Sequence, residues 1–277
     1  MNKIIFTLLM VFSFTAYTSA QDDEKIKGDR NVTIKQTYID PFNKIVVGED
    51  FSVEIIYNSK PSVEIETDSN LHEYILFDVV DGTLTFKTSK RITSSRRMNI
   101  KVNYSDGLEA IEVLDDGEIR SLTSLEMKNT SLKTSGSSRA YLNIKTNEFN
   151  YTASDKAKVK LNVNATNAVI ILNDNVKMEA LLNAKTAKID MYQRATANLE
   201  GTLSNTELRV DNSSSFNGKE FLTNTCNITA DMGSSATIRV NDSVTIAATG
   251  NSEVYLYNNP KITLPKFEGS VKLQMKE

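Results

Sequence analysis

The stretch TSGSSRAYLNIKTNEFNYTASDKAKVKLNVNATNAVIILND, residues 134–174, decides the fold of this chain. It is rich in small polar residues, yet Leu, Ile and Val return on alternate positions. Alternation of apolar and polar side chains is the period of a β-strand with one buried face, and a helix would show a longer period. The stretch therefore predicts several successive strands with no helix between them.

The strand signal recurs every 19 residues, and turn-forming residues mark the period. The markers are Gly117, Gly136, Asp155, Asp174, Gln193, Asn212, Asp231 and Gly250. An apolar residue stands four positions before each marker except Asp231, where a shift of one residue brings Ile228 into the apolar column. A repeat this short leaves no room for helices and predicts stacked β-coils, with equivalent residues about 4.8 Å apart.

The solenoid repeats are expected to fill residues 107–258 of an all-β chain. Residues 31–106 alternate strongly, and Asp81-Gly82 between two apolar runs predicts a hairpin. We therefore expect an antiparallel β-sheet cap over residues 21–106 and a second cap at residues 259–277, because open solenoid ends invite pairing with other chains. An antiparallel sandwich with accidental spacing is the alternative.

Residues 1–20 have the layout of a secretory signal peptide: a basic start, a short apolar core and small residues before Gln21. No later stretch is long and apolar enough to span a membrane. The net charge of −3 does not indicate nucleic acid as a partner. The chain is therefore expected to be extracytoplasmic and either soluble or peripherally held.

The chemical motifs of common enzymes are missing from the sequence. Cys226 is the single cysteine and His72 the single histidine, which excludes an intramolecular disulfide and disfavours Ser or Cys hydrolases and histidine-rich zinc sites. Asp116, Asp155 and Asp174 fall in or beside the turn column, where carboxylates of adjacent coils could perform glycosidase chemistry or bind calcium. Turns prefer the same residues, so neither a cofactor nor a metal is expected.

The arrangement resembles a bacterial family of secreted proteins described as putative auto-transporter adhesin, head GIN domain. The resemblance rests on FNKIVVGEDFSVEII, SVEIETDSNLHEYI, DGTLTFKT and GLEAIEVLDDGEI, followed by repeats such as LKTSGSSRAYLNIKT. It implies a right-handed parallel β-helix-like solenoid and an extracytoplasmic location in a Gram-negative bacterium. It supplies no catalytic residues.

One outward column of the predicted coils is basic. Arg120, Arg139, Lys158 and Lys177 each follow a marker by three residues, and Lys156 and Lys160 flank the same line. The column could bind an anionic glycan or cell-surface polymer, or it could be a solvated face partnered by Glu118 and Glu179. Asn143 should stack on Asn162, and Asn164 on Asn183, as amide ladders.

The preferred hypothesis is a secreted or surface-associated, non-enzymatic, adhesin-like module that recognises glycans or surface polymers. The alternatives are a carbohydrate-active enzyme that uses the Asp residues of a coil face, and a scaffold without a ligand. Association with further copies of the chain stays open. Asp242–Val244 resembles a bacterial O-glycosylation acceptor, which would make Ser243 a modification site.

Overall fold

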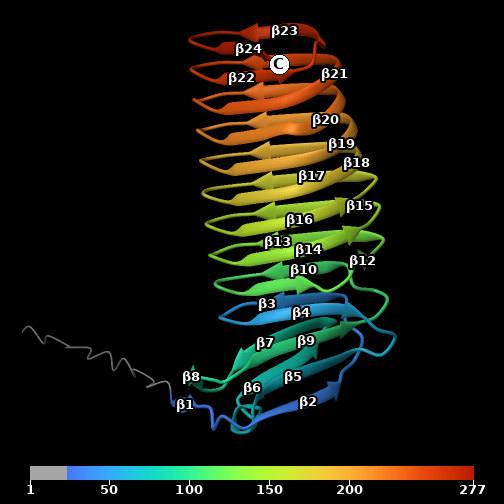
Figure 1. Ribbon diagram of the computed structural model, residues 1–277, viewed down its shortest axis with the longest axis vertical. Coiled ribbons are helices and arrows are strands. Elements are labelled where there is room, and N and C mark those ends of the chain that lie inside the picture. The colour runs from blue at the N-terminus through green and yellow to red at the C-terminus, as the bar shows by residue number, and fades with distance from the viewer. Residues whose placement is uncertain (1–23) are drawn as a thin grey trace, which may run out of the picture.

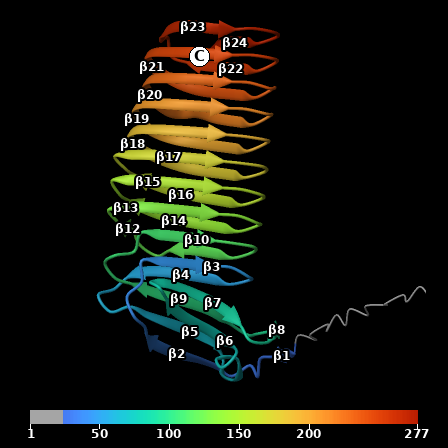
Figure 2. The same ribbon diagram turned by 180° about the vertical axis from the view of Figure 1, so that it is seen from behind.

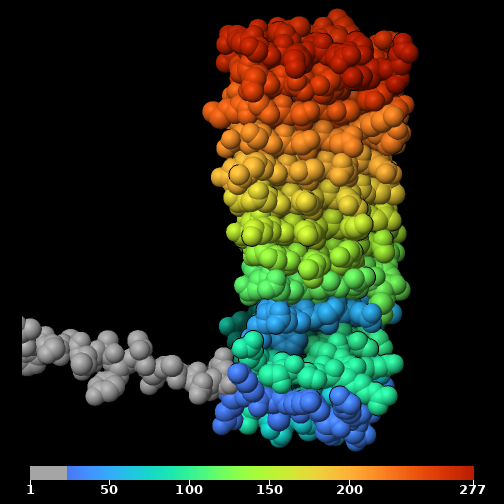
Figure 3. Space-filling view, turned by 60° about the vertical axis from the view of Figure 1, so that its left-hand side comes forward, coloured from blue at the N-terminus to red at the C-terminus, as the bar shows by residue number. Residues whose placement is uncertain are grey.

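The computed structural model describes residues 24–277, so the signal peptide predicted at residues 1–20 lies outside the described part of the chain. The described residues form a β-solenoid of about 9 coils with a spacing of about 19 residues, which confirms the predicted fold class. The coils stack in sequence order along one axis (Figure 1). Figure 3 shows them as a straight column with the N-terminal cap at one end.

The N-terminal region contains the first nine strands and a short 3₁₀ helix, and all of the strands except the third and fourth belong to the cap. The elements are β1 (Lys25–Lys27), β2 (Val32–Tyr38), β3 (Lys44–Val47), β4 (Ser52–Tyr57), β5 (Ser62–Asp68), η1 (Ser69–Leu71), β6 (Ile75–Val80), β7 (Thr83–Thr88), β8 (Arg91–Ser94) and β9 (Met98–Tyr104). β5 pairs antiparallel with β2 and β9, and β6 pairs antiparallel with β7. The predicted hairpin is confirmed: Asp81 and Gly82 join β6 to β7 with φ of 48° and 72°.

The remaining strands wind the coils. They are β10 (Ala110–Val113), β11 (Glu118–Ser121), β12 (Leu125–Glu126), β13 (Asn129–Thr134), β14 (Arg139–Lys145), β15 (Glu148–Ala153), β16 (Lys158–Asn164), β17 (Asn167–Leu172), β18 (Lys177–Met191), β19 (Thr196–Val210), β20 (Ser215–Ala230), β21 (Ser235–Ala248), β22 (Glu253–Tyr257), β23 (Lys261–Phe267) and β24 (Lys272–Lys276). Each strand pairs in parallel with its equivalents in the adjacent coils (Figure 2).

The coils present two sheets, which we name by their position relative to the tight turn of each coil. The front sheet follows the turn and contains β4, β11, β14, β16, β22, β24 and the first halves of β18–β21. The back sheet precedes the turn and contains β3, β10, β13, β15, β17, β23 and the second halves of β18–β21. The ladder of coils therefore includes β3 and β4 on one side and β23 and β24 on the other.

The core lies between the two sheets. Burial alternates along most coil strands, as in β16, because every second side chain points inward, whereas β23 in the last coil is exposed throughout. Phe149, Tyr151, Phe216 and Phe221 are the largest fully buried side chains. Small residues fill the same columns in adjacent coils, because Ala168 pairs with Phe149 and Ala197 pairs with Phe216, and this keeps the two sheets close together.

The coil spacing is 19 residues over much of the stack, 21 between β10 and β13, 20 over most of the β19–β20 pairing and 18 between β21 and β22. The predicted slip is confirmed, because Leu208 pairs with Ile228 at a spacing of 20 residues. The predicted marker Gly117 is wrong for the first repeat. Asp115, with φ of 53°, makes the turn that Gly136 makes in the next coil. This coil is two residues longer, and the extra residues lie between Ser121 and Leu125, where the register with β14 returns to 19 residues.

Candidate functional site

A basic row runs along the front sheet and consists of Arg139, Lys158 and Lys177. Arg139 pairs with Lys158, and Lys158 with Lys177, in consecutive parallel strands, as the repeat predicts. All three side chains are exposed, because their strand neighbours Ala140, Val159 and Met178 occupy the core. The row therefore presents one cation per coil over three coils at a spacing of about 4.8 Å.

Acidic and neutral residues bound the basic row. Glu118 pairs with Arg139 in the preceding coil, and their closest N–O distance is 3.9 Å. Thr196 continues the column after Lys177. Within residues 24–277, Lys158 and Lys177 form no ion pair, so their charges are available to a ligand.

Arg120 does not belong to this row, which corrects the sequence prediction. Because the first coil is two residues longer, Arg120 pairs with Tyr141 and not with Arg139. Its guanidinium lies 4.2 Å from the centroid of the Tyr141 ring, and its Nε donates a 2.7 Å hydrogen bond to Glu118. The Glu118 carboxylate raises the pKa of Arg120, so the charge of Arg120 is retained and internally paired.

Lys160 and Lys156 also lie outside the row. Lys160 is in the column of Tyr141 and forms a 2.9 Å ion pair with Glu179, which raises the pKa of the lysine. Lys156 lies in the tight turn before β16, where its backbone N–H donates to the carbonyl of Gly136. The six predicted residues thus separate into the basic row, in which Arg139 also contacts Glu118, two ion-paired residues beside it and one lysine at the turn.

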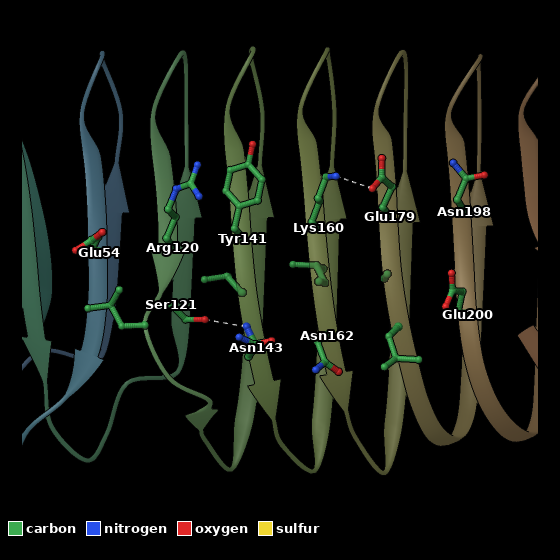
Figure 4. A pocket seen from close by; sticks show the side chains of 15 residues that line it. Glu54, Arg120, Ser121, Tyr141, Asn143, Lys160, Asn162, Glu179, Asn198 and Glu200 are labelled. Atoms are coloured by element: carbon green, nitrogen blue, oxygen red, sulfur yellow. Dashed lines mark hydrogen bonds and ion pairs between the residues drawn. The ribbon is translucent and has the colours of Figure 1, made fainter. Parts of the chain in front are cut away.

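A shallow groove of about 780 Å³ adjoins the row on the front sheet. Its side chains form two lines that run across the strands of the front sheet (Figure 4). The first line contains Glu54, Arg120, Tyr141, Lys160, Glu179 and Asn198, and the second contains Ser121, Asn143, Asn162, Leu181 and Glu200. The groove therefore combines hydrogen-bonding groups, mixed charges and exposed apolar surface along the solenoid axis.

Several polar groups of the groove have no partner. Asn143 and Asn162 are in register, as predicted, but among residues 24–277 the only hydrogen bond at this pair that involves a side chain is the 2.8 Å donation from the Asn143 backbone N–H to Ser121 Oγ. In the described part of the chain, the two side-chain amides, the Tyr141 hydroxyl and the Glu200 carboxylate form no hydrogen bond within the protein. These groups can bind the hydroxyls of a ligand.

The exposed leucines of the groove are functional candidates that the sequence reasoning missed. Leu122 is 45% exposed and Leu181 is 40% exposed, although both are large apolar side chains. A sequence signal existed for Leu181, because Leu181 and Leu182 are consecutive in an alternating strand and only one of them can face the core. Leu122 lies in the two-residue extension and has no such signal.

Two of the candidate catalytic carboxylates accept hydrogen bonds from backbone N–H groups in the tight turns. Asp155 Oδ2 accepts a 2.9 Å hydrogen bond from the backbone N–H of Gly136, and Asp174 Oδ2 accepts one of 3.1 Å from Asp155. The Gly136 N–H and the Ser154 hydroxyl lower the pKa of Asp155. Asp116 is exposed. Among the described residues, no group of three or more His, Cys, Asp or Glu side chains could hold a metal ion.

Asp155→Asn is expected to weaken the solenoid at neutral pH but not in acid. The folded state lowers the pKa of Asp155, so this carboxylate stabilises the fold above its ordinary pKa of about 3.9 and loses the effect as the pH falls through the folded value. The melting temperatures of wild type and variant should therefore differ at pH 7 and converge as the pH falls through the folded-state pKa of Asp155. Asp116→Asn is the control, and an equal pH dependence in that variant would contradict the assignment.

The remaining candidates lie in structural positions. Ser243 is half-buried in β21, between Thr225 and Lys261 of the adjacent coils. Cys226 is buried in the core, which raises the pKa of its thiol. His72 forms a 2.9 Å hydrogen bond with Thr33 in the cap.

Residues 41–181 and 154–260 match the family described as "Putative auto-transporter adhesin, head GIN domain". The chain belongs to this family. No functionally curated protein matches it. In the part of the head GIN chain that the structure describes, no helix has the length and apolar character needed to cross a membrane.

Solved structures share the fold of this head GIN protein. A "putative adhesin" from Parabacteroides merdae is 17% identical with a TM-score of 0.62, covering 92% of this chain and 100% of its own. A "putative adhesin" from Parabacteroides distasonis is 18% identical with a TM-score of 0.61, covering 91% and 100%. A "Putative lipid binding protein" from the same species is 16% identical with a TM-score of 0.63, covering 92% and 100%. At these identities the likeness shows the fold alone.

Proposed function

We propose that this head GIN protein is an extracytoplasmic, adhesin-like, non-enzymatic module that binds an anionic glycan along its front sheet. The observation that carries the proposal is the basic row of Arg139, Lys158 and Lys177, which is exposed and in register. Cations one coil apart, about 4.8 Å, match the rise of an extended sugar chain. Several weak contacts on a rigid line add up without an ordering cost for the protein.

The rival hypothesis of a carbohydrate-active enzyme lacks a suitable pair of carboxylates. Asp155 and Asp174 accept backbone hydrogen bonds from the preceding turn, and lowering of its pKa makes Asp155 a poor general acid. The groove acids do not replace them as a pair, because Glu179 is paired with Lys160 and the other two acids, Glu54 and Glu200, lie at opposite ends of the groove. These contacts favour binding over catalysis on this face.

Lys158→Glu/Lys177→Glu is expected to weaken binding to an acidic polysaccharide by at least about tenfold, or ~1.4 kcal/mol, because two attractions become repulsions. Wild-type binding should also weaken as salt is added. The measurement is a titration by isothermal calorimetry at two ionic strengths.

Lys133→Glu/Lys188→Glu is the control for net charge, since these lysines are exposed on the back sheet, where Lys188 lies 3.7 Å from Asp190, and the change in net charge is the same. This variant should bind like wild type. Equal losses in both double variants would show that only the net charge matters, and would contradict a site on the front sheet.

A further inference from the structure

We infer that the glycan is a polysaccharide in which charged and uncharged sugars alternate, with its acids on the basic row and its hydroxyls in the adjoining groove. The inference rests on the proposed function and assigns the class of ligand to the same face. Its basis is the arrangement of charge and of unpaired polar groups across the strands.

The first condition on the ligand is that its spacing matches that of the coils along the solenoid axis. An extended, two-fold polysaccharide advances by roughly one coil spacing, about 4.8 Å, with each sugar. Successive rings face opposite sides, so the same edge of the polymer meets the row only at every second coil. Arg139 and Lys177 lie two coils apart, with Lys158 between them. Two acids on alternate sugars can thus contact both ends of the row.

The second condition on the ligand is that its charges match the distribution of charge across the groove. The side chains that line the groove include three acids, Glu54, Glu179 and Glu200, and two cations, Arg120 and Lys160. Both cations are already paired with Glu118 or Glu179. A polymer with an acid on every sugar would direct every second carboxylate at this acidic side, where like charges repel. A polymer with alternate acids directs all of them at the row.

The third condition on the ligand is that it carries hydroxyls for the unpaired polar groups of the groove. Asn143, Asn162 and the Tyr141 hydroxyl offer donors and acceptors, and Glu200 offers acceptors, all suited to uncharged sugar hydroxyls. The exposed faces of Leu122 and Leu181 can contact the C–H surfaces of the rings. A polyanion that lacks sugars would leave these groups unused, so the groove distinguishes a polysaccharide from other polyanions.

The experiment compares three probes of matched length: hyaluronan fragments, with one carboxylate per disaccharide; polygalacturonate, with one per sugar; and polyglutamate, with no sugar. Wild type should bind hyaluronan at least about tenfold more tightly than the other two. Asn143→Ala/Asn162→Ala should lose most of this advantage while its affinity for polyglutamate is unchanged. Glu200→Gln should strengthen the binding of polygalacturonate.

The outcomes separate the two proposals. If Lys158→Glu/Lys177→Glu weakens all probes but wild type binds hyaluronan and polygalacturonate equally, the anionic site stands and the alternating ligand is overturned. The alternating ligand is also overturned if Asn143→Ala/Asn162→Ala weakens the binding of polyglutamate as much as the binding of hyaluronan. If wild type binds none of the probes, or the lysine variant binds all of them normally, the proposed function fails and this inference fails with it. Thermal melting confirms that each variant is folded.

Discussion

Val159→Asp is expected to destabilise the domain by about 3–5 kcal/mol, the cost of leaving an unpaired charge in a protein core. Val159 is 2% exposed and stacks between Ala140 and Met178 in an inward column. The two sheets approach closely here, so the carboxylate has neither water nor a cation to solvate it. Urea denaturation measures the loss.

Lys158→Asp is the control, one residue away on the outward side of the same strand. Its cost should be about 1 kcal/mol or less, because the side chain stays in water. Similar losses for the two variants would contradict the inward and outward assignment of β16.

Gly201→Ala is expected to cost about 3 kcal/mol or more, although it adds only a methyl group. Gly201 lies in β19 with φ of 125°, and a Cβ there would come within 2.0 Å of the Leu182 carbonyl oxygen in the preceding coil. The coils cannot separate locally without breaking the parallel ladder on both sides of this residue.

Gly107→Ala separates the two causes of that loss. Gly107 also has a positive φ, 105°, but no atom lies within 4 Å of its added Cβ. This variant should lose only the cost of backbone strain, about 1 kcal/mol. If chemical denaturation gives equal losses for the two glycines, contact between coils is not what requires Gly201.

Most of the coil register could be predicted from the sequence, because alternation and a fixed period leave few ways to stack the strands. The pairs Asn143–Asn162 and Lys158–Lys177 follow directly from the 19-residue spacing. The slip at Ile228 was also recoverable, since only that shift restores an apolar residue to the core. In each case burial of the inward columns decides the register.

The first coil could not be predicted in the same way. Asp115, Asp116 and Gly117 are all residues that turns accept, so the sequence does not choose among them. The structure places the positive φ at Asp115. Two additional residues between Ser121 and Leu125 compensate for the earlier turn and restore the 19-residue spacing. They are exposed and therefore carry no hydrophobic signal. The error at Arg120 follows from this ambiguity alone.

The two-residue extension of that coil also has a consequence for how such proteins diverge. The extension moves Arg120 from the column of Arg139 to that of Tyr141, while Ile119 remains buried against Ala140. A short insertion at a coil corner thus changes which surface side chains become neighbours, without any substitution in the core. Lineages can alter their outer faces by such insertions while keeping the same backbone.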